Sequence, residues 1–126
     1  MNFPENLKYT SQHEWILVNG SSAKIGITDF AQGELGDVVF VELPPIGKQV
    51  QQGESVGTIE AVKTVAELYS PVTGEVIRVN EKIKDSPEIV NKDPYGEGWM
   101  VQLRIANVKE LDGLLTVEAY KKLVGQ

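Results

Sequence analysis

Lys63 is the side chain in this sequence whose surroundings best suit a chemical role. The residues on either side, 56–62 and 65–69, are rich in β-branched and apolar types and are bounded by glycine and proline, which predicts two strands joined by a tight turn. Lys63 is the only cation between Lys48 and Arg78. A single amine at a hairpin tip suits covalent modification. An ordinary solvated lysine is the simpler interpretation of the hairpin and the lysine alone.

Two carboxylates, Glu60 and Glu67, bracket the lysine. They can face solvent on the strands, or they can take part in the recognition of Lys63 by another protein, and the sequence leaves both interpretations open. If Lys63 is acylated, its amine becomes a neutral amide. The chemistry would then come from the attached cofactor, and the role of the protein would be to present that cofactor to other proteins.

The chain has little catalytic or metal-binding equipment of its own. It contains no cysteine, so disulfides and thiolate metal sites are excluded. Its one histidine is His13, and no nucleophile can be paired with it from the sequence. We expect His13 to make a structural hydrogen bond near Trp15, and we expect no zinc site.

The composition indicates one soluble globular domain spanning residues 1–126. The chain is 41% hydrophobic and 24% charged, and its net charge is -6. An acidic chain is a poor ligand for phosphate backbones, so no nucleic-acid partner is expected. No apolar run approaches the ~20 residues of a membrane span, and the N-terminus lacks an export signal. We therefore expect a cytoplasmic protein, or a mature organellar form in the mitochondrial matrix.

Hydrophobic periodicity predicts a mainly β domain with a small helical appendage at its C-terminus. An internal similarity between 36–41 and 74–79 suggests two duplicated units, although any two buried strands that follow a glycine turn look alike. Asn107 and Glu110 have the spacing of a capping box at the start of a helix. The segment 80–98 is expected to be mostly loop, with a helical turn before Asp85. Strands are predicted at 14–18, 23–27, 36–43, 56–62, 65–69, 75–79 and 99–105, and helices at 29–32, 107–112 and 116–124.

The segment from Glu60 to Val76 resembles the lipoyl-lysine segment of glycine cleavage system H proteins. Further segments resemble that family in the same order, and the resemblance covers nearly the whole chain. They are 9–10, 13–15, 25–29, 35–44 and 94–100. A biotin carrier is the lesser alternative, because Val62 and Thr64 stand where such carriers have methionine beside the lysine.

The resemblance implies a lipoyl/biotinyl-domain-like sandwich, or flattened barrel, of two small antiparallel sheets with short helices. The lipoyl hairpin would lie within 53–76 and the C-terminal helices within about 107–124. Lys63 matches the lysine that carries covalent lipoate. The chain would be a non-catalytic, monomeric carrier that receives an aminomethyl group from the pyridoxal-phosphate-dependent glycine decarboxylase (P protein). It would deliver the group to the folate-dependent aminomethyltransferase (T protein) and be reoxidised by dihydrolipoyl dehydrogenase (L protein).

The resemblance also suggests roles for residues around Lys63. Glu60, Val62, Thr64 and Glu67 would be read by the lipoylating enzymes, although the stretch after the lysine is bulkier than in many family members. Glu14 and Glu34 are expected to line a cleft in which the loaded arm rests. Glu34 departs from the polar or histidine residue often found at its position in the family.

Two other functions fit the same lysine. The chain could donate lipoyl or octanoyl groups to other lipoyl domains, or it could be a binding module that keeps the fold without being lipoylated. An assay of transfer to another lipoyl domain separates the first from glycine cleavage. Analysis of Lys63 in protein from its native cell tests the second.

Overall fold

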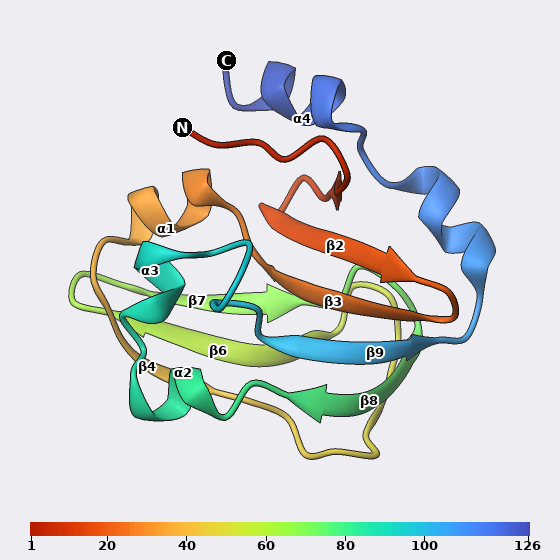
Figure 1. Ribbon diagram of the computed structural model, residues 1–126, viewed down its shortest axis with the longest axis horizontal. Coiled ribbons are helices and arrows are strands. Elements are labelled where there is room, and N and C mark those ends of the chain that lie inside the picture. The colour runs from red at the N-terminus through yellow and green to blue at the C-terminus, as the bar shows by residue number, and fades with distance from the viewer.

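Nine β-strands form two antiparallel sheets in the computed structural model, which describes all 126 residues (Figure 1). One sheet has six strands in the order β1-β2-β3-β9-β8-β5, and the other has three in the order β4-β6-β7. The strands are β1 (Lys8–Tyr9), β2 (Glu14–Asn19), β3 (Ser22–Ile27), β4 (Val38–Glu42), β5 (Gln49–Val50), β6 (Ser55–Ala61), β7 (Val65–Tyr69), β8 (Gly74–Val79) and β9 (Val101–Ile105). The helices are α1 (Asp29–Leu35), α2 (Lys82–Asp85), α3 (Ile89–Lys92), the 3₁₀-helix η1 (Val108–Gly113) and α4 (Val117–Leu123).

The main apolar core lies between the two sheets. Ile25 and Leu103 enter it from the six-stranded sheet, and Ile59 and Leu68 enter it from the three-stranded sheet. All four are fully buried. Burial of such β-branched and aliphatic side chains on the facing sides of two sheets is the main favourable term in folding. The prediction of a two-sheet, mainly β fold is confirmed, with sheets that do not close into a barrel.

A second, smaller core joins the two ends of the chain. The rings of Tyr9 and Tyr120 stack with centroids 4.6 Å apart, and Phe3 meets Tyr120 edge-on at 5.8 Å. Trp15 lies in the same cluster and donates from its indole nitrogen to the carbonyl of Pro94 at 2.9 Å. Helix α4 is therefore held against β1 and β2, and both termini lie at the same end of the molecule (Figure 1).

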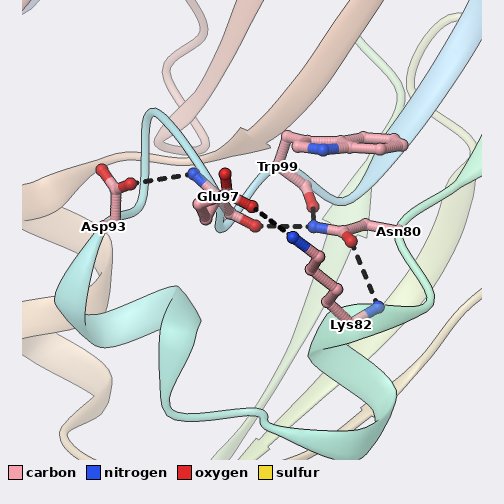
Figure 2. Close-up of polar contacts among 5 residues, drawn as sticks. All are labelled: Asn80, Lys82, Asp93, Glu97 and Trp99. Carbon is pink, nitrogen blue, oxygen red and sulfur yellow. Dashed lines mark hydrogen bonds and ion pairs between the residues drawn. The ribbon is translucent and has the colours of Figure 1, made fainter.

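The loop that leads into β9 is organised by one buried amide, that of Asn80. Its Nδ2 donates to the carbonyls of Glu97 at 2.6 Å and Trp99 at 2.7 Å, and its Oδ1 accepts from the Lys82 amide at 3.2 Å (Figure 2). The Glu97 amide donates to the carboxylate of Asp93 at 2.9 Å. These bonds satisfy backbone groups that have no partner in a sheet or helix.

Helix α1 is longer than the sequence predicts, ending at Leu35 and not near Gln32. The side chain of Thr28 caps its start by accepting from the Ala31 amide at 3.2 Å. Its end is set by Gly36, whose φ of 79° lies in the left-handed region that favours glycine and whose amide donates to Gln32. Gly33 remains within the helix, and therefore the prediction that a glycine at this position bounds it is wrong.

The predicted capping box is only half formed. Asn107 does accept from the Lys109 amide, at 3.1 Å, but the segment is a 3₁₀-helix. The Glu110 carboxylate does not reach back to Asn107. It accepts instead from the amide of Thr73 at 2.7 Å and from the Thr73 hydroxyl at 2.9 Å.

The remaining differences from the predictions are local. The helical turn before Asp85 is confirmed as α2, whereas α3 was not predicted within the polar segment 80–98. The similar segments 36–41 and 74–79 contribute β4 and β8 to two different sheets, one of three strands and one of six. None of the helices has the length and apolar character that crossing a membrane requires.

Candidate functional site

Lys63 lies at the tip of the β6–β7 hairpin. The last paired residues of the two strands are Glu60 and Val65. The amide of Ala61 donates to the carbonyl of Thr64 at 2.8 Å, which closes a turn with Lys63 at its end. Residues 62–65 are all exposed, and no ion pair involves Lys63. The amine is therefore accessible on a turn of defined geometry.

The turn is also tied to the neighbouring strand. The amide of Val62 donates to the carbonyl of Asp37 at 3.0 Å, and Val38 at the start of β4 pairs with Ala61. All three strands of the smaller sheet thus hold the Lys63 turn. It projects from one end of the molecule, on the side of α1 and α3 (Figure 1). Because the turn is already ordered, binding of a partner does not carry the entropic cost of ordering a loop.

A groove of about 300 Å³ lies between α1 and the β6–β7 hairpin. We call it the α1 groove. Ile27, Leu35 and Ile59 are buried at its base, and the carboxylates of Glu34 and Glu67 are exposed. Apolar walls with a few polar groups are typical of sites that hold a small organic group. Its full lining is Gln12, His13, Ile27, Phe30, Ala31, Glu34, Leu35, Ile59, Ala66 and Glu67.

His13 forms part of the α1 groove in an unusual backbone conformation. Its φ of 68° is left-handed, and it is the one non-glycine residue with a positive φ. Its Nδ1 lies 2.9 Å from the Tyr120 hydroxyl, and its ring lies 4.8 Å from the ring of Phe30. Burial lowers the pKa of His13 below its usual value of 6.5, although the charge of Glu34 acts to raise it. The imidazole is therefore uncharged at neutral pH.

The expected structural hydrogen bond of His13 is made with the hydroxyl of Tyr120, which belongs to the same small core as Trp15. No local pattern pointed to Tyr120 as the partner, because it lies 107 residues away in the chain. Phe30 was likewise not singled out, although its position in a short helix beside the groove brings it into the site. A helical pattern extended to Leu35 would have placed Phe30 and Glu34 on the same face of α1.

Glu14 lies in a second hollow of about 270 Å³, which shares only Gln12 with the α1 groove. The carboxylate is 2% exposed and accepts from the Thr10 hydroxyl at 2.5 Å and from the Tyr69 amide at 3.1 Å. Burial raises the pKa of Glu14 to about 7, although both hydrogen bonds act to lower it. The two carboxylates expected in one cleft, Glu14 and Glu34, thus line two separate hollows.

The residues expected to guide lipoylation surround Lys63 but differ in their contacts. Glu60, Val62 and Thr64 are exposed, and no hydrogen bond involves the Glu60 side chain. Glu67 accepts at one carboxylate oxygen from the hydroxyls of Ser55 at 3.0 Å and Thr58 at 2.9 Å. These hydroxyls lie on β6, so the neighbouring strand fixes the orientation of Glu67. No group of three His, Asp or Glu side chains is arranged to hold a metal ion.

The fold and the site define a class of protein. Two small antiparallel sheets that present one accessible lysine on a tight turn, beside a groove for a small organic group, form a carrier domain. The family model of the glycine cleavage H-protein matches residues 7–126, and the chain belongs to this family. The family is the lipoyl carrier of the glycine cleavage system, with lipoate attached to a lysine, and is not itself a catalyst.

Relatives match over essentially their whole length. The glycine cleavage system H protein of Bacteroides thetaiotaomicron is 52% identical over 124 residues, which cover 98% of each chain. That of Staphylococcus carnosus is 50% identical over 126 residues, the full length of both. The crystal structure of a glycine cleavage system H protein from Mycobacterium marinum superposes with a TM-score of 0.89 at 39% identity, covering 98% of this chain and 99% of that one.

Proposed function

We propose that Lys63 is the lysine to which lipoate is attached, within one carrier domain that spans residues 1–126. The observation that carries this proposal is the position of Lys63. It is the only cation in the β6–β7 hairpin, it is exposed, and it is free of ion pairs. The hairpin gives a modifying enzyme access to the amine and gives an attached arm freedom to swing.

The α1 groove is the proposed resting place of the loaded arm. Ala66 and Glu67 follow Lys63 by three and four residues in the chain, so they lie at most about 10–13 Å from it, within the reach of a lysine lengthened by an acyl chain. The lipoyl group, when attached, supplies a disulfide and dithiol that can accept and release an aminomethyl group. The apolar base of the groove would exclude water from this cargo.

Charge in the groove suits a cationic cargo. Glu34 and Glu67 place two carboxylates on its wall, and burial keeps His13 uncharged. A protonated amine is attracted to such carboxylates more strongly in a partly dry groove than in water. Glu34 therefore strengthens this site. Glu14 lies in the other hollow, so we propose that it acts on the arm only through the end of β7, where it holds the Tyr69 amide.

The partners follow from the place of the family in the glycine cleavage system. We infer that the arm visits the pyridoxal-phosphate-dependent glycine decarboxylase (P protein), the folate-dependent aminomethyltransferase (T protein) and the flavin-dependent dihydrolipoyl dehydrogenase (L protein). Lipoylating enzymes would read Glu60, Val62, Thr64 and Glu67 around Lys63. We further infer a monomer that works in the bacterial cytoplasm, in keeping with the bacterial sources of the relatives named above.

The test of this proposal is the mass and location of the modification. Expression with lipoate is expected to add one lipoyl group, located on Lys63 by peptide mapping. Lys63→Arg is expected to remain folded but to lose both the added mass and the glycine-dependent reduction of the arm. The matched control is Lys109→Arg, since Lys109 is exposed and its side chain is in no ion pair. A lipoyl group found on another lysine would refute the assignment.

A further inference from the structure

We propose that the outer face of the β4-β6-β7 sheet is the docking surface for the enzyme that attaches lipoate, with Phe40 on β4 as its aromatic anchor. This inference rests on the proposed role of Lys63. It extends the surface that the enzyme contacts from the lysine hairpin to the neighbouring strand β4. We call the surface the Phe40 face. It comprises Val39, Phe40, Glu42, Glu60, Val62 and Val65.

The strand register brings these residues together. Phe40 pairs with Glu60 on β6, and Glu60 pairs with Val65 on β7, so the three form one row across the sheet. The next row, Val41, Ile59 and Ala66, faces the core. Because neighbouring residues on a strand point to opposite faces, the Phe40 row faces outward.

The face is unusually apolar for a surface. Eight large apolar side chains of the chain are strongly exposed, and four of them are here: Val39 at 55%, Phe40 at 49%, Val62 at 72% and Val65 at 59%. Val39 is exposed because the pairing between β4 and β6 shifts after Val38, which leaves Val39 unpaired. Exposed apolar groups that cluster in one place, and not singly, mark interaction sites.

Charge on the face indicates the chemistry of the partner. Glu42 and Glu60 are the acidic residues of the Phe40 face, and neither is in an ion pair. Lys48 shares a hollow with Glu42 but is paired with Glu54 at 3.7 Å. A complementary protein surface would have an apolar pocket flanked by arginine or lysine.

The short length of the unmodified lysine side chain distinguishes the enzyme that attaches lipoate from the other partners. Before modification, Lys63 offers an amine on only four methylene groups, so the enzyme must contact residues directly beside the turn. Enzymes that act on the far end of the arm can remain farther away. In the attachment step the lysine nitrogen attacks the carboxyl carbon of lipoyl adenylate, which forms from lipoate and ATP with release of pyrophosphate. A C–N amide bond forms, the bond from the acyl carbon to AMP breaks, and AMP and one proton leave.

The experiment measures lipoylation rates with a purified bacterial lipoate–protein ligase, lipoic acid and ATP. Phe40→Ala is expected to raise the KM for the carrier roughly tenfold with little change in kcat, because an aromatic anchor contributes to binding more than to chemistry. Its control is Ile46→Ala, which removes an apolar side chain that is 66% exposed outside the face. Ile46→Ala is expected to behave as wild type.

A second variant keeps the test independent of any folding defect in Phe40→Ala. Glu42→Lys reverses a charge on the face without changing an apolar residue, and it is expected to raise KM about fivefold at low salt and less at high salt. Glu5→Lys is the matched control, because Glu5 is exposed near the N-terminus and its side chain has no polar partner. Thermal unfolding of each variant checks that the fold is kept.

The outcomes separate this inference from the function on which it rests. If wild-type protein is not lipoylated at Lys63, the proposed function fails. If wild type is lipoylated there and both face variants match their controls, the Phe40 face is not the docking surface. Sedimentation that shows a wild-type dimer, lost in Phe40→Ala, would identify a second copy of this chain as the occupant and would also overturn the proposal.

Discussion

The hydroxyl of Tyr120 lies 2.9 Å from Nδ1 of His13 and 2.7 Å from Oγ1 of Thr28. Thr28 in turn caps helix α1 through the Ala31 amide. One hydroxyl of the last helix therefore holds both a wall residue of the α1 groove and the residue that starts the helix beside it. The C-terminal helix is in this way part of the support of the candidate site.

Replacement of Tyr120 by phenylalanine tests this support. The ring can still stack on Tyr9, but His13 and Thr28 lose a buried partner, so we expect the free energy of unfolding to fall by about 1–2 kcal/mol. His13 is the only histidine, so its imidazole signals in NMR can be assigned without ambiguity and are expected to shift. Tyr69→Phe is the control, since the Tyr69 hydroxyl makes no hydrogen bond to the protein. Equal stabilities and unchanged imidazole signals would contradict the role of Tyr120.

The buried carboxyl of Glu14 predicts a pH dependence of stability. Its pKa is raised from 4.5 to about 7, so between these values the folded state binds more protons than the unfolded state, and stability falls as pH rises. Glu14→Gln cannot ionise and avoids this loss. We expect the stability of the variant relative to wild type to increase by on the order of 3 kcal/mol from pH 4.5 to pH 8.

Urea unfolding at a series of pH values measures this difference, and Glu5→Gln serves as the exposed control. Other titrating groups cancel because they are common to wild type and variant. A difference that stays constant with pH would show that Glu14 titrates alike in the folded and unfolded chain.

Replacement of glycine by alanine is expected to have opposite effects on stability at two positions. A Cβ on Gly74 would collide with the carbonyl oxygen of Arg104 on the neighbouring strand β9, so Gly74→Ala is expected to lower stability by about 2 kcal/mol or more. A Cβ on Gly33 meets no atom within 4 Å, and the residue lies within α1. Gly33→Ala is therefore expected to raise stability by about 0.5–1 kcal/mol. Thermal and urea unfolding of the two variants check both signs.

The hairpin around Lys63 was predictable because its signals are local. Two runs of strand-forming residues with a short turn between them can pair in only one simple way, and alternation along the strands decides which side chains face the core. The same local rule placed Glu60 and Glu67 beside the lysine. It could not show that Ser55 and Thr58 hold Glu67, because that depends on the register between β6 and β7.

The predictions were wrong where the hydrogen bonds or packing of a short segment depend on residues that are distant in the sequence. Glu110 was expected to bind Asn107 but binds Thr73, which is 37 residues away. Gly33 was expected to bound α1, but Leu35 is buried at the base of the groove and holds the helix in place for another turn. Tertiary contacts outweigh the modest penalty for glycine within a helix.

The sequence by itself determined the displayed lysine, the mainly β fold and the lack of cysteine chemistry, since these follow from residue types and short-range spacing. Only the tertiary structure decided that Glu34 and Glu67 share one groove while Glu14 lies in another, and that Phe40 stands in a row with Glu60 and Val65. The physical reason is that sheet register, and the packing of α1 and α4 against the sheets, bring together residues whose separation along the chain carries no local signal.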